Sequence, residues 1–264
     1  MQYLPITLLL IPLLICGCNK NEDMSAQIEQ TLKDNPQIVM DLIRENSQEF
    51  MEALAQAQQH AQREQFFSQV KAEMEGERLA PKISDSRLTL GNPDAQTDVV
   101  VYSDFLCGYC AQGDVMIQRM LKAFGDDIRV TLKHMPMQAE ASQVGAKYVE
   151  ALYTLDKQKA ITLYHDLFKE QRKLAQNPER YLEAKLKELG LTQKEITKVK
   201  DLVASSEISS IIAKDVLEAQ SFGVQGTPSL LIDGVIFRGM APEEWMLEAL
   251  EMIIIDTKQK ENQR

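Results

Sequence analysis

The sequence predicts an α/β fold in which an inserted helical domain interrupts a small sheet, with an N-terminal helical association segment ahead of both. Three patterns predict this architecture. A run of β-branched residues, a helical stretch and a second apolar run follow one another between residues 98 and 133. Helical periodicity without strand signals then fills residues 138–206. A hairpin pattern and a closing helix follow residue 227.

Composition limits the range of functions. The chain has 264 residues, a length that permits one or two domains. Hydrophobic residues make up 44%, which is ordinary for a globular chain. The net charge is −10 and the basic residues are dispersed, so nucleic acid is not expected as a partner.

The first residues predict export. Residues 3–15 are almost all apolar and too short to span a bilayer comfortably, which is typical of a signal peptide, here residues 1–17. Ile15-Cys16-Gly17-Cys18 resembles a bacterial lipobox, which implies a lipid on Cys18 as the mature N-terminus. No Lys or Arg precedes the apolar run, so an uncleaved N-terminal anchor is the alternative. Either way we expect a bacterial periplasmic protein held at a membrane.

The residue two positions after Cys18 bears on which membrane holds the chain. It is Lys20 rather than Asp. By resemblance to the enterobacterial sorting rule, this favours the outer membrane over the inner one.

Residues 18–80 are predicted to be a tether and a helical oligomerisation segment. Helical character breaks once, at Asn35-Pro36, where Asn35 suits a helix cap and Pro36 the first helical position. A narrow apolar seam follows at alternating spacings of three and four: Met40, Ile43, Ser47, Phe50, Leu54, Ala57 and Ala61. Such a seam is closer to a coiled coil than to a core-facing helix. We expect a homo-oligomer, a dimer before a trimer; packing on the chain's own remaining domain is the alternative.

A linker over residues 76–86 leads into the sheet. Residues 88–90 predict a short strand, and residues 98–103 a central strand buried on both faces, because their β-branched run is continuous. A helix over residues 107–124 and a strand over residues 128–133 follow. This order predicts a parallel strand pair with a right-handed crossover.

The second half of the chain is predicted to be mostly helical. Thr192 and Glu195 have capping-box spacing inside the helical insertion. A helix over residues 207–222 leads to a hairpin around Asp233-Gly234, and a helix over residues 242–255 closes the fold.

Cys107 and Cys110 are the main chemical signal. They open a helix, where unpaired N–H groups and the positive end of the helix dipole favour a thiolate, the attacking species in disulfide exchange. Zinc is the alternative, but it needs about four ligands, the mature chain has no second cysteine pair and the histidines are scattered. If Cys16 is removed with the signal peptide and Cys18 carries lipid, Cys107 and Cys110 are the free thiols that remain in an exported protein. We expect redox chemistry without a metal or cofactor.

A second signal lies far downstream, at Thr227-Pro228 before a predicted strand. Together with Cys107-Gly108-Tyr109-Cys110, it resembles the thioredoxin superfamily, whose Thr-Pro or Val-Pro loop packs a cis proline against the disulfide. Proline lacks an N–H and leaves an edge clean for a substrate strand. The helical insertion makes the arrangement similar to DsbA. That resemblance assigns residues 87–137 and 207–256 to a thioredoxin-like domain and residues 138–206 to an inserted helical domain.

The resemblance also implies roles for the site residues. Cys107 is expected to be the exposed nucleophile and Cys110 the resolving thiol. Four residues are expected to contact substrate: Gly108, Tyr109, Thr227 and Pro228. In DsbA a glutamate lies six residues before the first cysteine, where this chain has Val101. The nearest carboxylate, Asp104, is a candidate proton shuttle, with a loop cap as the alternative.

The function implied is that of an exported thiol-disulfide oxidoreductase that forms or rearranges disulfides in secreted proteins. Gly108-Tyr109 supplies no imidazole, so a milder oxidant than DsbA is expected. The combination of Cys-Gly-Tyr-Cys with Thr-Pro resembles that of the isomerase DsbC. The N-terminal segment resembles the association regions of ScsC. Both oxidase and isomerase activity therefore remain open as predictions. Expected partners are unfolded or misfolded secreted proteins and a DsbB-like or DsbD-like membrane redox protein. The alternatives are a lipid-anchored binding or chaperone-like surface protein with incidental cysteines, and copper binding.

Overall fold

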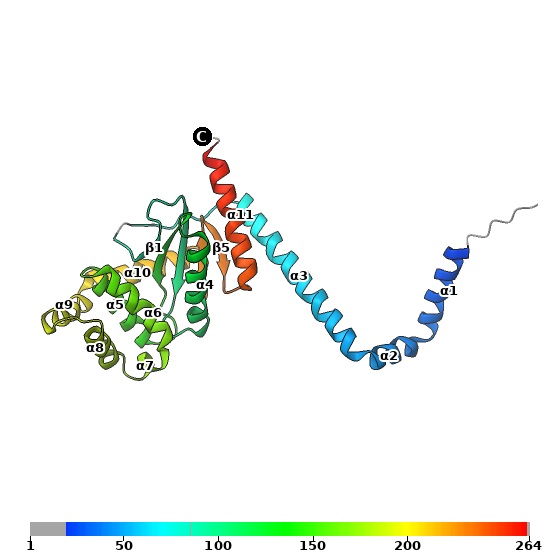
Figure 1. Cartoon of the computed structure of the whole chain (residues 1–264), viewed down its shortest axis with the longest axis horizontal. Helices are drawn as coiled ribbons and strands as arrows, with labels where there is room; N and C mark the ends of the chain where they lie inside the picture. The colour runs from blue at the N-terminus through cyan, green and yellow to red at the C-terminus, as the bar shows by residue number, and fades with distance from the viewer. Residues whose placement is uncertain (1–19, 85, 263–264) are drawn as a thin grey trace, which may run out of the picture. The chain divides into compact units, whose positions relative to one another are not determined.

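The computed structural model describes residues 20–84 and 86–262 (Figure 1). The chain divides into two compact units, and the division falls between Gln62 and Arg63. The predicted signal peptide and the predicted lipid attachment site Cys18 lie outside the described residues. No helix among residues 20–84 and 86–262 combines the length and the apolar character needed to cross a bilayer.

The first unit is helical. It contains α1 (Lys20–Asp34), α2 (Pro36–Glu45) and the first part of α3 (Ser47–Glu75). Pro36 opens α2 at a position where its missing N–H costs nothing, as predicted. The prediction of a single break was wrong, because a second one separates α2 from α3 at Asn46. The Asn46 side chain donates to the Leu42 carbonyl at 2.9 Å, a local hydrogen bond that competes with helix continuation.

Large apolar side chains of the first unit are exposed. The exposed set comprises Met24, Ile28, Leu32, Ile38, Val39, Met40, Leu42, Phe50, Met51 and Leu54. Helix α2 buries none of its residues. Among residues 24–62 no side chain is buried, as a predicted association segment requires.

The second unit is built on a five-stranded sheet in the order β1-β3-β2-β4-β5. These strands are β1 (Thr89–Gly91), β2 (Thr97–Ser103), β3 (Ile128–His134), β4 (Ser229–Ile232) and β5 (Val235–Arg238). Strands β2 and β3 pair in parallel, and the other neighbours pair antiparallel. The predicted parallel pair and hairpin are confirmed.

Helices cover both faces of the sheet. On one face, Val99 and Val101 of β2 share a core with α4 (Gly108–Phe124) and α11 (Glu243–Glu261). On the other face, Val100 and Tyr102 share a smaller core with α10 (Ser206–Ser221). Because alternate residues of a strand point to opposite faces, burial on both sides explains the continuous apolar run in β2.

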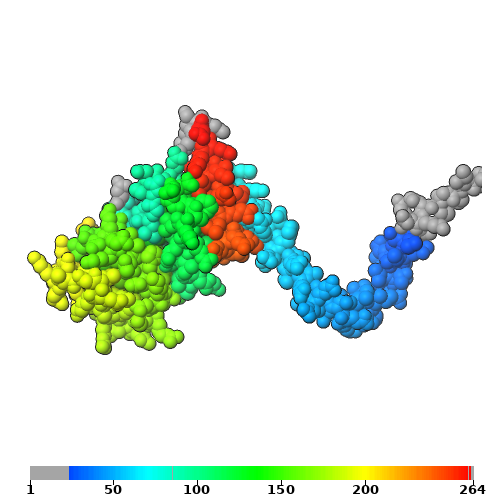
Figure 2. All heavy atoms as spheres, in the orientation of Figure 1, coloured from blue at the N-terminus to red at the C-terminus, as the bar shows by residue number. Residues whose placement is uncertain are grey.

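The inserted helices lie between β3 and α10 in the chain. They are α5 (Glu140–Tyr153), α6 (Lys157–Lys169), α7 (Gln171–Gln176), α8 (Pro178–Glu188) and α9 (Gln193–Val203). Figure 2 shows them, green to yellow, as a lobe continuous with the surface of the sheet domain. The capping box predicted at Thr192 and Glu195 is confirmed. An α/β fold with a thioredoxin-like sheet, a helical insertion and an N-terminal helical segment is therefore confirmed.

The end of α3 belongs to the second compact unit, which begins at Arg63, whereas the association segment predicted from the sequence extends to residue 80. Phe67 and Val70 are buried in its core, and the Phe66 ring centroid lies 5.7 Å from that of Trp245. Arg63 pairs with Glu248 of α11 at 2.5 Å. The seam that predicts association ends at Ala61, and these aromatic residues start a separate apolar face that packs on α11.

Within the predicted linker over residues 76–86, Arg78 and Leu79 contact the sheet domain. Leu79 N donates to the Gly234 carbonyl at 3.0 Å, and Arg78 pairs with Asp233 and Asp256. Gly234 has a φ of +79°, and a Cβ on it would lie 2.4 Å from the Leu79 oxygen. Glycine at this hairpin turn is therefore required both by the backbone angle and by the approaching chain.

Candidate active site at the start of helix α4

Cys107 and Cys110 lie at the N-terminus of α4. Cys107 is the N-cap residue, with φ −81° and ψ 122°, and Cys110 N donates to its carbonyl at 3.1 Å. Both thiols are free and buried, Cys107 being 8% exposed and Cys110 1%. Cys107 is thus the more exposed of the two, although it is not open to solvent. The positive, N-terminal end of the α4 dipole lies at Cys107.

The Thr227-Pro228 loop lies across from Cys107. The Cys107 Sγ donates to the Thr227 carbonyl at 3.3 Å, and the Thr227-Pro228 bond is cis, as the sequence predicts. A Cβ at Gly113 would lie 3.4 Å from Pro228 Cγ. This is an ordinary van der Waals distance, so α4 packs directly against the proline ring. Residues 120 positions apart in the chain meet at this site.

Two of the predicted substrate-contacting residues form an exposed rim beside the thiols. Tyr109 is 65% exposed, and a Cβ at Gly108 would meet nothing within 4 Å. Met137, from the loop after β3, is also exposed. Pro228 is buried and Thr227 is half-buried. The surface around Cys107 is thus open on the Gly108-Tyr109 side.

The two thiols have different surroundings. Burial raises the pKa of the Cys110 thiol to about 11. Hydrogen bonds from the side chains of Ser103 and Thr227 and from the Asp104 backbone oppose this rise. The Asp104 N–H lies 3.4 Å from Cys110 Sγ. Cys110 is therefore a thiol that loses its proton with difficulty, as expected for a buried partner of a more accessible nucleophile.

Asp104 has the contacts of the loop cap that the sequence left as the alternative to a proton shuttle. Its Oδ1 accepts from Leu106 N at 2.7 Å and from Ser142 Oγ at 2.6 Å. Its Oδ2 accepts from Met137 N at 2.5 Å and from Gln138 N at 2.8 Å. The buried carboxylate thus joins the loop before Cys107 to the loop before α5.

We expect Asp104→Ala to lower the free energy of unfolding by about 3 kcal/mol, because buried donors left unpaired each cost about 1–3 kcal/mol. Urea denaturation of the reduced protein measures this. The exposed Asp94→Ala is the matched control, with an expected change within about 0.5 kcal/mol. Equal stability of the two variants would show that the Asp104 contacts contribute little.

Gln171, in the inserted domain, contacts the backbone around Cys107, and it was not identified from the sequence. Its Nε2 donates to the Phe105 carbonyl at 2.8 Å and to the Cys107 carbonyl at 2.9 Å. No local pattern marks this glutamine, because its partners lie more than 60 residues earlier in the chain. The contact fixes the backbone that presents the Cys107 thiol.

Lys133 and His134 are buried and paired at the end of β3. Lys133 pairs with Glu218 of α10. His134 Nε2 lies 2.9 Å from Glu150 of α5. Both residues join β3 to neighbouring helices.

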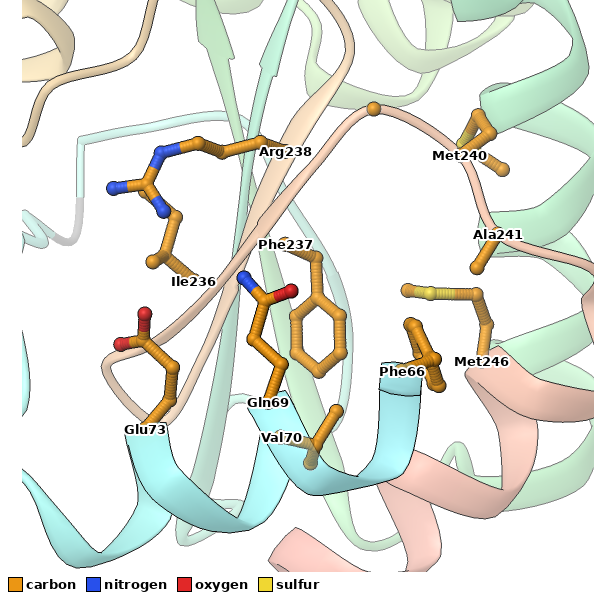
Figure 3. Close-up of a pocket in the computed structure, with 11 residues that line it drawn as sticks. Phe66, Gln69, Val70, Glu73, Ile236, Phe237, Arg238, Met240, Ala241 and Met246 are labelled. Atoms are coloured by element: carbon orange, nitrogen blue, oxygen red, sulfur yellow. The ribbon is translucent and has the colours of Figure 1, made fainter. Parts of the chain in front are cut away.

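A pocket of about 210 Å³ lies near the site, between the end of α3, strand β5 and the start of α11 (Figure 3). Phe237 forms its apolar wall, and Gln69 and Glu73 of α3 border it. Met240 joins the pocket to the thiol site: it lines the pocket, and its Sδ would lie 3.6 Å from a Cβ at Gly113. In the described part of the chain, no three His, Cys, Asp or Glu residues form a group that could hold a metal ion.

Comparisons with known proteins agree with this geometry. A family model described as Thioredoxin matches residues 83–252. A probable disulfide bond formation protein D of Bacillus cereus is 31% identical over 155 residues, which cover 55% of this chain and 69% of the relative.

Two solved structures share the fold. BdbD from Bacillus subtilis in its oxidised form has a TM-score of 0.58 at 20% identity, covering 68% of this chain and 99% of that one. Proteus mirabilis ScsC in a transitional conformation has a TM-score of 0.55 at 18% identity, covering 91% of this chain and 99% of that one.

Proposed function

Because the chain belongs to the thioredoxin family and is a DsbA-like protein disulfide oxidoreductase, we propose that it forms and rearranges disulfides in exported proteins through Cys107 and Cys110. The observation that carries the proposal is the pair of free thiols at the start of α4 facing the Thr227-Pro228 loop. The relative's name, disulfide bond formation protein, supports it.

In the proposed reaction, Cys107 exchanges with substrate and Cys110 closes the internal disulfide. When the protein acts as an oxidase, a substrate thiolate attacks the Cys107–Cys110 disulfide at Cys107. Cys110 then leaves with the electron pair. A second substrate thiolate then displaces Cys107. Acting as an isomerase, the reduced Cys107 attacks a substrate disulfide instead. In both directions the reacting Cys107 sulfur lies at the positive, N-terminal end of α4.

We propose unfolded or misfolded secreted polypeptides as substrates. The exposed Tyr109 and open Gly108 leave room beside Cys107 for a chain of varied sequence. Pro228 adds no N–H to the surface that the substrate meets. The apolar pocket beside Met240 has room for a side chain of such a segment.

We also propose that the chain is exported and held at a bacterial membrane by a lipid on Cys18. The apolar residues 3–15 and the Cys16-Gly17-Cys18 sequence support this, with the outer membrane favoured by Lys20. A DsbB-like or DsbD-like membrane protein would then restore the redox state of the Cys107–Cys110 pair.

Self-association of the first unit is the remaining part of the proposal. Its exposed apolar side chains, such as Ile28, Leu42 and Phe50, support burial against a second copy. We favour a dimer over a trimer. Two Cys107 thiols around one cleft would hold a misfolded chain during repeated attack, which favours isomerisation.

Refolding of ribonuclease tests the function. The mature protein is expected to reactivate scrambled ribonuclease, and in its oxidised form to reactivate reduced ribonuclease. Activity on the scrambled substrate alone indicates an isomerase. Failure on both substrates, with suppression of their aggregation, would instead indicate the lipid-anchored chaperone-like alternative.

A further inference from the structure

Side chains of the inserted helices hold the turn that leads into α4. Residues 104–107 form this turn, called the thiol turn below because Cys107 ends it. Ser142 of α5 accepts a hydrogen bond from Phe105 N at 3.1 Å. Gln171, the first residue of α7, donates from Nε2 to the carbonyls of Phe105 and Cys107 at 2.8 and 2.9 Å. Contacts from two inserted helices therefore converge on the backbone just before the thiols.

The Gln171 amide uses both of its hydrogens in this contact. A side-chain amide has two N–H donors on its nitrogen and an oxygen that only accepts. Both partners of Gln171 are carbonyl oxygens, so the nitrogen must face them. The Cys107 carbonyl also accepts from Cys110 N at 3.1 Å and from Ala111 N at 3.3 Å. Gln171 thus bonds to the same oxygen that begins the hydrogen bonding of α4.

Apolar packing fixes the helix that carries Gln171. Leu174, one turn later on α7, is fully buried. A Cβ at Gly145 of α5 would lie 3.3 Å from the Phe105 ring and 3.4 Å from Leu174. The Phe105 ring also lies against that of Phe168 on α6, at a centroid distance of 4.9 Å. The thiol turn and the helix that carries Gln171 therefore share one core, which places the amide against the turn.

On the basis of the proposed function, we propose that Gln171 is a positioning residue for disulfide exchange. Its amide holds the thiol turn in the conformation from which the Cys107 sulfur attacks. In this conformation Cys107 Sγ lies 3.3 Å from the Thr227 carbonyl, at the loop where substrate is proposed to bind. Without the amide, the Phe105 and Cys107 carbonyls lose their shared donor. The turn then gains freedom, and the sulfur less often has the geometry for attack.

Stopped-flow measurement of the first exchange step tests this role. An excess of the reduced full-length mature protein is mixed with a peptide whose cysteine carries a 2-pyridyl disulfide. The Cys107 thiolate bonds to the peptide sulfur, and the pyridyl sulfur leaves with the electron pair. The leaving group takes a proton from solvent and becomes pyridinethione, whose absorbance is followed.

Gln171→Met keeps the length of the side chain and removes the amide. We expect it to slow pyridinethione release about tenfold, a part of the roughly 10²-fold cost of a misplacement of about 1 Å. Gln176→Met is the matched control, because Gln176 is exposed at the other end of the same helix. It should keep the wild-type rate. Rates are compared under conditions in which urea denaturation shows each variant to be folded.

Gln171→Glu separates hydrogen-bond donation from structural support. The new side chain has nearly the same shape, but its ionised carboxylate has no donor for the two carbonyls. At pH 7 this variant should be at least as slow as Gln171→Met. As the pH falls toward about 5, its rate relative to wild type should rise, because a carboxyl beside two carbonyls protonates above its ordinary range and can then donate.

The wild-type protein, measured at each pH, accounts for the titration of groups that all the proteins share around the contact, such as Cys107, Asp104 and Glu170. The relative rate of Gln171→Met should not change with pH, because methionine does not titrate. If Gln171→Met does not fold, the pH dependence of Gln171→Glu decides the question.

The outcomes are distinct. A wild-type rate in folded Gln171→Met overturns the inference and leaves the proposed function intact. A deficit of Gln171→Glu that stays the same at every pH also overturns it, because the amide donor would then not set the rate. A wild-type protein that releases no pyridinethione contradicts the proposed function itself.

Discussion

Cys107→Ser is expected to abolish disulfide exchange, whereas Cys110→Ser is expected to accumulate mixed disulfides with substrate proteins. The reason is the order of the steps: Cys107, at the helix start and the more exposed thiol, makes the first bond, and Cys110 breaks it. Non-reducing gels of each reduced variant incubated with scrambled, disulfide-containing ribonuclease show the adducts directly: the Cys107 thiolate attacks a substrate disulfide, and the other substrate sulfur leaves as a thiolate.

The double variant, with serine at both positions, is the matched control and should trap nothing. Adducts on Cys107→Ser and none on Cys110→Ser would reverse the assigned roles. That result would require Cys110 to become accessible, although it is 1% exposed.

A chain that starts at Arg63 is expected to fold, to remain redox-active and to be monomeric. It removes the first unit, whose residues 24–62 bury no side chain, and keeps the α3 residues that pack on α11. A chain that starts at Glu77 also loses Phe66, Phe67 and Val70. Truncating one buried Phe costs about 3–5 kcal/mol, so the shorter chain should lose at least that much stability.

Light scattering measures the oligomeric state of each chain, and urea denaturation measures its free energy of unfolding. Phe67→Ala and Phe50→Ala provide a matched pair in the full mature chain: the first should destabilise the sheet domain, and the second should weaken association only. The Arg63 chain should also lose activity on scrambled ribonuclease and keep it on reduced ribonuclease. A full-length mature protein that is monomeric at micromolar concentration would rule out association.

The sequence predicted the features whose signals are local. The Cys107–Cys110 pair, the Thr227-Pro228 loop and the strand on either side of α4 each follow from a few neighbouring residues. Backbone preferences such as those of Pro36 or the capping box at Thr192 act over one turn, so they too could be predicted.

Features that depend on distant contacts could not be predicted. From the inserted helices, Gln171 donates to the Cys107 carbonyl and Tyr164 packs on Phe105, and nothing within their own helices marks either residue. Phe66 and Phe67 continue a helix already interpreted as an association segment, so their packing on α11 was missed. At Asn46 the side chain donates to the Leu42 carbonyl and interrupts the helix, an alternative that the local sequence permits but does not require.

Equilibration of the reduced mature protein with mixtures of reduced and oxidised glutathione tests thiol-disulfide exchange at Cys107 and Cys110 most directly. The products are trapped by acid and alkylation and identified by mass spectrometry. We predict one reversible intramolecular disulfide between Cys107 and Cys110, which forms in a single transition as the mixture becomes more oxidising. Two thiols that alkylate independently in every mixture, with no bond between them, would contradict the assignment.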